Sequence, residues 1–103
     1  MNLVELGSGD DGRHLTVSVA DAVLVRLPES GTPGHRWDIT LSGAARVADD
    51  RIEPPAGPVA GAALMRRLAI ALDAPGPVSF RAVRESPWGE EPERYTVDLD
   101  VAG

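Results

Sequence analysis

Apolar and polar residues alternate strictly in five segments of the chain. The apolar members of these segments are Leu15, Val17 and Val19; Val23, Val25 and Leu27; Trp37, Ile39 and Leu41; Val78, Phe80 and Ala82; and Tyr95, Val97, Leu99 and Val101. A period of two places each apolar set on one face of a pleated strand. Several short strands with turn signals between them predict an all-β fold, either a sandwich or a barrel.

Segments rich in proline and glycine separate these predicted strands. They are Pro28–Gly34, Glu53–Pro58, Ala74–Pro77 and the polar stretch from Ser86 to Pro92. Proline cannot donate a backbone hydrogen bond, so the second segment is neither helix nor central strand, and the third is a tight reversal. No repeat or linker divides the 103 residues. We therefore expect residues 1–103 to form a single domain.

The segment Gly61–Leu72 is ambiguous. Leu64, Leu68 and Leu72 recur at the spacing of a helical stripe, and the segment is rich in good helix formers. Leu68, Ile70 and Leu72 equally fit the alternation of a strand. Local propensity favours a helix, whereas the predicted strands on both sides favour a strand, because tertiary context overrides weak propensity.

Composition excludes several classes of function. The chain has no cysteine, so it can form no disulfide, thiolate metal site or cysteine nucleophile. Hydrophobic residues make up 43%, enough for one core. The net charge of −6 comes from acidic residues spread along the chain, and such a surface repels phosphate backbones and anionic membranes. We expect no nucleic-acid partner, no membrane association and no cofactor.

The start of the chain, Met1–Leu6, has neither the basic residues nor the apolar run of a signal peptide. No stretch approaches a transmembrane helix. Every basic residue apart from histidine is Arg and none is Lys, which indicates a GC-rich, bacterial genome. As it stands, the chain is expected in the cytoplasm.

No catalytic group stands out. A hydrolase needs a nucleophile, a base and a group that orients the base, and the only candidate histidine bases are His14 and His35. His14 lies at the start of a predicted strand and His35 in a turn-rich segment, so both are interpreted as surface residues. No Gly-x-Ser-x-Gly elbow is present. The chain is therefore predicted not to be an enzyme.

Clustered charged residues are also interpreted as ordinary surface. Asp10-Asp11-Gly12 and Asp49-Asp50 lack the spaced ligands of a calcium loop and are expected to be polar turns, so no metal site is predicted. The cluster Glu90, Glu91 and Glu93 is expected in a solvated loop. Arg66 and Arg67, if they lie on a strand, would point to opposite faces.

The two tryptophans differ in their surroundings. Trp37 begins an alternating apolar set and is predicted to be a core residue. Trp88 lies in Pro87-Trp88-Gly89-Glu90-Glu91, among loop formers and charge. An exposed loop tryptophan is typical of a contact with a protein partner, although Trp88 could equally fold back over the sandwich edge.

Three segments, in order, resemble the binding loops of the chagasin-type inhibitors of papain-like cysteine peptidases. The family motifs are N-P-T-T-G-[FY]-x-W, G-x-G-G and R-P-W. The corresponding segments here are Ser30-Gly31-Thr32-Pro33-Gly34-His35-Arg36-Trp37, Gly61-Ala62-Ala63-Leu64 and Ser86-Pro87-Trp88. The matching residues are Thr32, Gly34, Trp37, Gly61, Pro87 and Trp88. The resemblance covers roughly residues 13 to 101.

The resemblance implies a fold and a mechanism. The family fold is an immunoglobulin-like antiparallel β-sandwich, which makes residues 64–72 a strand. The three loops form a wedge at one end that blocks the peptidase cleft reversibly and without a covalent bond. By resemblance, Thr32 and its neighbours would cover the catalytic Cys–His pair, Trp88 would pack on the cleft wall, and residues 61–64 would brace the other side.

Departures from the motifs keep a second function open. Ser30-Gly31 replaces Asn-Pro, Ala63-Leu64 replaces Gly-Gly, and Ser86 replaces Arg. The primary hypothesis is a reversible protein inhibitor of a papain-like peptidase. The alternative is an immunoglobulin-like binding or assembly module that has lost peptidase inhibition.

Overall fold

The computed structural model describes residues 2–29, 36–53, 64–85 and 91–103. This part of the chain contains eight strands and one short 3₁₀ helix. The elements are β1 (Leu3–Leu6), η1 (Ser8–Asp10), β2 (His14–Ser18), β3 (Ala22–Glu29), β4 (Asp38–Ser42), β5 (Ala45–Glu53), β6 (Leu64–Leu72), β7 (Gly76–Arg84) and β8 (Glu93–Ala102). The predicted all-β class is confirmed.

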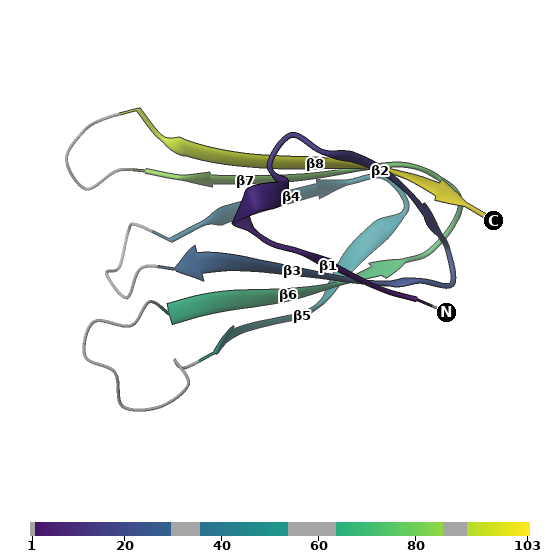
Figure 1. Ribbon diagram of the computed structural model, residues 1–103, viewed down its shortest axis with the longest axis horizontal. Helices are drawn as coiled ribbons and strands as arrows, with labels where there is room; N and C mark the ends of the chain where they lie inside the picture. The colour runs from purple at the N-terminus through teal and green to yellow at the C-terminus, as the bar shows by residue number, and fades with distance from the viewer. Residues whose placement is uncertain (1, 30–35, 54–63, 86–90) are drawn as a thin grey trace.

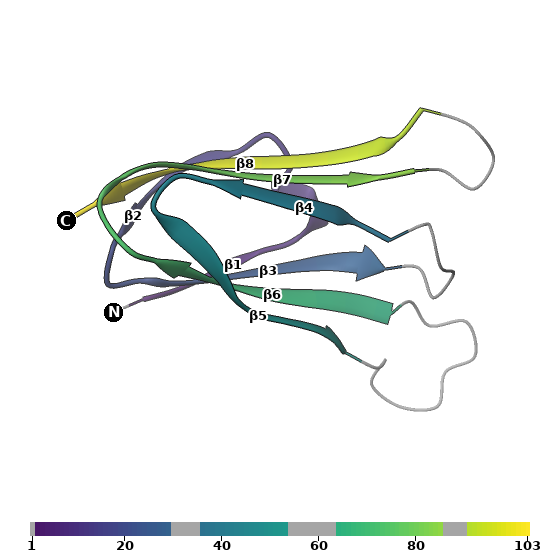
Figure 2. The same ribbon diagram turned by 180° about the vertical axis from the view of Figure 1, so that it is seen from behind.

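The strands form two sheets that face each other as the layers of a sandwich (Figure 1, Figure 2). One sheet has the order β1-β3-β6-β5 and the other the order β2-β8-β7-β4. Most neighbours are antiparallel, while β1 runs parallel to β3 and β2 runs parallel to β8. The two-layer arrangement buries one face of each sheet against the other.

The core consists of the apolar sets that alternate in the sequence. Its buried side chains are Leu6, Val17, Val23, Val25, Leu27, Trp37, Leu68, Ile70, Val78, Phe80, Ala82, Tyr95, Val97, Leu99 and Val101. Phe80 and Tyr95 meet edge to face across the β7–β8 pair, with ring centroids 6.0 Å apart. The alternation therefore identified the buried face correctly, and the prediction that Trp37 is a core residue is confirmed.

The ambiguous segment 64–72 is a strand. β6 lies in the interior of its sheet, paired with β3 on one side and β5 on the other. Leu68 and Ile70 are buried, as the two-residue period requires. Backbone hydrogen bonding on both edges outweighs the modest helical propensity of the alanines and leucines. The strand expected from the resemblance is confirmed.

Two strands have no alternating signal, and the sequence did not predict them. β1 has only four residues. β5 is an edge strand whose register shifts between Val47 and Asp49. Such a bulge moves side chains off the two-residue period. The interpretation of Asp49-Asp50 as a turn is therefore wrong, because both residues lie within β5.

The turn-rich segments also differ slightly from expectation. The sequence predicts a loop at Pro28 and Glu29, but they are the last residues of β3, opposite Met65 and Leu64. Pairing with β6 continues through Pro28, where β1 no longer pairs with β3 and a missing N–H on the open side is tolerated. The predicted reversal at 74–77 does join β6 to β7, and Gly76 adopts the positive φ of 133° that a side chain would resist.

Within the described ranges, no helix is both long and apolar enough to cross a membrane.

Candidate binding end of the sandwich

Most of the residues predicted to contact a partner lie outside the described residues. They are Ser30, Gly31, Thr32, Pro33, Gly34, His35, Gly61, Ala62, Ala63, Ser86, Pro87 and Trp88. Leu64 is described: it is the first residue of β6 and is half-buried. The described part of the site consists of the strand ends that flank the three predicted segments.

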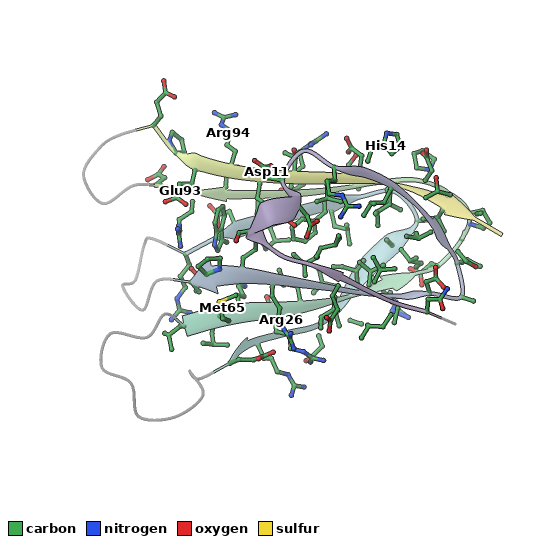
Figure 3. All side chains as sticks on the ribbon, viewed as in Figure 1. Asp11, His14, Arg26, Met65, Glu93 and Arg94 are labelled. Atoms are coloured by element: carbon green, nitrogen blue, oxygen red, sulfur yellow. The ribbon has the colours of Figure 1, made fainter. Side chains whose placement is uncertain are left out.

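These strand ends gather at one end of the sandwich (Figure 1). The register places Glu29 opposite Leu64, Glu53 opposite Met65, and Arg84 opposite Glu93. Figure 3 shows Met65 and Glu93 at this end, on different sheets, with His14 well away from it. The first segment joins β3 to β4, the second joins β5 to β6 and the third joins β7 to β8, and the strand ends that flank all three lie at this end of the sandwich.

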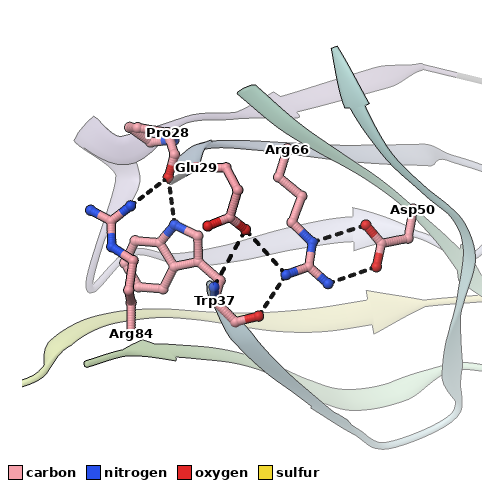
Figure 4. A network of polar contacts seen from close by, with 6 residues as sticks. All are labelled: Pro28, Glu29, Trp37, Asp50, Arg66 and Arg84. Atoms are coloured by element: carbon pink, nitrogen blue, oxygen red, sulfur yellow. Dashed lines mark hydrogen bonds and ion pairs between the residues drawn. The ribbon is translucent and has the colours of Figure 1, made fainter. Parts of the chain in front are cut away.

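Trp37 is the centre of a polar network at this end (Figure 4). Its indole is buried in the core, while its Nε1–H donates a hydrogen bond to the carbonyl oxygen of Pro28 at 2.6 Å. Its backbone N–H donates to Oε2 of Glu29 at 3.4 Å. Trp37 directly precedes β4, whereas Pro28 and Glu29 end β3, so these bonds join the two sheets.

Arg66 extends the network to a third strand. Its Nε and Nη2 donate to the two carboxylate oxygens of Asp50 at 2.9 and 2.7 Å, a bidentate pair. Its Nη1 donates both to Oε2 of Glu29, at 3.3 Å, and to the carbonyl oxygen of Trp37. The side chain of Arg66 is 17% exposed and that of Glu29 1% exposed. One guanidinium thus connects β3, β5 and the residue before β4.

The pKa values of the Arg66–Asp50 pair move in the directions that favour the charged forms. The hydrogen bonds from Arg66 lower the pKa of Asp50, and the same bonds raise the pKa of Arg66. Both groups therefore stay charged at neutral pH.

Arg84, on β7 of the second sheet, also contacts Pro28 and Trp37. Its Nη1 donates to the carbonyl oxygen of Pro28 at 3.0 Å, and its guanidinium carbon lies 4.6 Å from the centre of the Trp37 ring. Its Nη2 donates to Oε2 of Glu93 at 2.8 Å. The Pro28 carbonyl therefore accepts hydrogen bonds from both Trp37 and Arg84, and Arg84 joins the end of β7 to the start of β8.

A hollow of about 230 Å³ lies beside the network and is lined by Glu29, Arg36, Asp50, Arg51, Ile52 and Arg66. Charged side chains of both signs line it, and Ile52 supplies a partly exposed apolar surface.

The prediction that Arg66 and Arg67 face opposite ways is supported by their partners. Arg66 contacts the network between the sheets, whereas Arg67 lies near Asp49 and Glu53, with N–O distances of 3.7 and 3.3 Å. The sequence places this pair among ordinary surface charges, which is wrong for Arg66, whose side chain is only 17% exposed. Its only signal for a role at the site was the position of Arg66 shortly after the second predicted segment.

The other charged candidates serve local structure away from this end. The carboxylate of Asp10 accepts a hydrogen bond from the Gly7 N–H and pairs with Arg13, which lowers its pKa. The carboxylate of Asp11 accepts a hydrogen bond from the Thr96 N–H. The contacts of Asp10 are the turn-type role expected from the sequence, whereas Asp11 links the N-terminal segment to β8.

His14 is exposed on β2, and its Nε2 lies 2.7 Å from Oδ2 of Asp100. It is a surface residue, as predicted. At the third segment, Glu93 begins β8 rather than lying in a loop, Glu91 is described and exposed, and Glu90 lies outside the described residues.

Comparisons with known proteins agree with this architecture. Residues 16–101 match the family model described as the chagasin family peptidase inhibitor I42. A search of curated protein sequences finds no match. Among solved structures, the chain is similar to the cysteine protease inhibitor EhICP2 from Entamoeba histolytica, with a TM-score of 0.85 and 20% identity over 99% of this chain and 97% of that one.

The chain is also similar to amebosin, whose solution structure gives a TM-score of 0.61 and 17% identity over 99% of each chain. At these identities the two structures support the fold. The matched family range agrees with the range of the resemblance found in the sequence.

Proposed function

The chain belongs to the chagasin family of peptidase inhibitors, and we propose that it inhibits papain-like cysteine peptidases by inserting three loops, at residues 30–35, 61–64 and 86–88, into the active-site cleft. Membership supports inhibition of these peptidases. The proposal concerns how it inhibits: reversibly, without a covalent bond, and without turning over a substrate.

One observation carries the proposal. The strand ends that flank the three segments lie together at one end of the sandwich, and a continuous set of hydrogen bonds joins them across both sheets (Figure 4). A rigid support of this kind limits the entropy that the attached loops lose when they dock. It therefore suits a wedge that enters a cleft.

Within this wedge, we assign the largest share of binding energy to Trp88. Residues at the centre of a protein contact, above all tryptophans, typically contribute about 2 kcal/mol or more, roughly thirtyfold in affinity. Thr32 would lie at the tip beside the catalytic pair. Pro33 and Pro87 restrict the backbone of their loops because their φ angle is fixed.

Substitutions in the loops test this assignment. Trp88→Ala and Thr32→Arg should each weaken inhibition of papain by roughly thirtyfold or more, while the melting temperature stays near that of the wild-type chain. Val83→Ala, at an exposed position on β7, is the matched control and should change neither quantity. If Trp88→Ala unfolds the chain, Trp88 has a structural role and the assignment is wrong.

A further inference from the structure

Arg66 contacts the chain on both sides of two of the proposed loops. Glu29 immediately precedes residues 30–35 and Trp37 follows them closely, and Arg66 donates hydrogen bonds to both. Asp50 lies on β5 shortly before residues 54–63, and Arg66 itself follows that segment on β6. A single guanidinium therefore fixes the distance between the ends of the first loop and links them to both ends of the second.

Arg84 does the same for the first and third loops. It lies on β7 just before residues 86–90, and its partner Glu93 begins β8 just after them. Its other contacts, the Pro28 carbonyl and the Trp37 ring, flank the first loop. The two arginines thus meet around Trp37, and together they connect the bases of all three loops.

The chemistry of the two side chains suits such a role. Both side chains are largely shielded from water, at 17% and 18% exposure. Their hydrogen bonds to Glu29, Trp37 and Pro28 are partly buried, whereas those to Asp50 and Glu93 are exposed. Arginine presents several donors in a planar, rigid fork, so it can hold three acceptors in fixed directions, which a lysine ammonium cannot. The loss of either side chain can therefore weaken affinity for the peptidase even if that side chain does not contact the peptidase.

We propose that Arg66 and Arg84 are positioning residues for inhibition: they set the spacing of the three loop bases and keep the loops in the geometry that enters the cleft. This inference rests on the proposed function. Losing either contact set lowers the fraction of molecules with all loops correctly spaced, and the apparent inhibition constant rises by the inverse of that fraction.

The test compares the two arginines at the loop bases with two exposed arginines of the same sheets. Arg66→Lys keeps the positive charge near Glu29 and so protects the fold, but it loses the fork. Arg84→Met removes the third-loop connection. The matched controls are Arg46→Met on β5 and Arg81→Met on β7, exposed arginines whose partners Asp73 and Asp98 flank none of the three loops.

We expect Arg66→Lys and Arg84→Met to raise the inhibition constant for papain roughly tenfold or more, measured well below each variant's melting temperature. The two control variants should stay within about threefold of the wild-type chain, as expected for surface substitutions. An unchanged inhibition constant for both Arg66→Lys and Arg84→Met would overturn the proposal.

A double-mutant cycle separates positioning from simple destabilisation. If Arg84 acts by placing the third loop, Arg84→Met should raise the inhibition constant by a smaller factor in a Trp88→Ala background than in the wild-type chain. The reason is that the main contact of that loop with the peptidase is already missing. Arg66→Lys, which concerns the first and second loops, should cost the same in both backgrounds. Equal costs for Arg84→Met in both backgrounds would mean that Arg84 only supports the fold.

The failure of this inference is distinguishable from failure of the proposed function. If the wild-type chain inhibits papain and the arginine variants inhibit equally well, only the positioning role is wrong. If the wild-type chain itself inhibits no papain-like peptidase, both are wrong.

Discussion

Trp37 combines roles that the sequence revealed only in part. Its burial could be predicted, because it begins an alternating apolar set. Its hydrogen bond to Pro28 and its stacking with Arg84 could not, because they depend on which strands become neighbours and in what register. At the scale of single residues, the pattern identifies what is buried but not which polar groups pair at the sandwich end.

Trp37→Ala should lower the free energy of unfolding by about 3–5 kcal/mol, as expected for truncating a core aromatic. The loss includes the hydrogen bond to Pro28 and the stacking with Arg84. Denaturant titration measures it, with Val83→Ala as the control at an exposed position and an expected change within about 0.5 kcal/mol. Equal stability of the two variants would place Trp37 outside the core.

The Asp50–Arg66 pair should make stability depend on acidity. Since the folded pKa of Asp50 lies below its ordinary value of 3.8, its stabilising contribution is fully present above that value and is lost as pH falls through the folded pKa. Asp50→Asn should therefore be less stable than the wild-type chain at neutral pH. The difference between them should shrink steadily below about pH 4, as followed by thermal melts. A constant difference down to pH 2 would contradict this assignment.

Tyr95 gives a second titration that is easy to observe, because it is the only tyrosine in the chain. Burial, and next the carboxylates of Asp10 and Asp11, raise the pKa of its hydroxyl to about 12. The hydroxyl donates to the Gly7 carbonyl at 2.9 Å. The protonated Tyr95 hydroxyl contributes fully to the free energy of unfolding below about pH 10, and this contribution is lost as pH rises toward the folded pKa.

Phenolate absorbance should therefore appear near pH 12 in the folded chain and near pH 10 in denaturant. Folded-state titration near pH 10 would show that the hydroxyl is exposed.

At the scale of elements, the sequence predicted strands with a regular period, including the edge strands β2 and β4, and missed the short β1 and the bulged β5. β7 and β8 show clear alternation because one face of each is buried. β1 and β5 are edge strands, one very short and one bulged, and neither produces a regular period. For residues 64–72, local propensity favours a helix, whereas the neighbouring strands and the family resemblance favour the strand that the structure shows.

Proline substitutions test this difference between β6 and β5. Ala69 lies in interior β6, paired on both sides, whereas Ala48 lies in the bulge of β5 and has no partner in the register. Ala69→Pro should abolish the cooperative thermal transition or lower stability by about 3 kcal/mol or more, because it removes ladder hydrogen bonds within a sheet. Ala48→Pro should be tolerated much better. Comparable losses would mean that β6 is not an interior strand.

At the scale of the whole molecule, the fold and the family followed from the sequence, while the support of the site did not. Spaced motifs around Trp37 and Trp88 indicated three loops in order. That their flanking strands converge on Arg66 and Arg84 requires the topology, since these residues are distant in sequence from their partners Glu29 and Pro28. Arg66 and Arg84 carry no motif that distinguishes them from the other arginines.

The central claim is that this sandwich blocks a papain-like peptidase reversibly with its loop-bearing end. The most direct measurement titrates active papain with the wild-type chain, dilutes the complex, and then analyses the recovered chain by mass spectrometry. Our account predicts inhibition that saturates at one chain per peptidase, activity that returns on dilution, and a chain that emerges intact. No inhibition at high micromolar concentration, or inhibition that ends as the chain is cleaved, would contradict it.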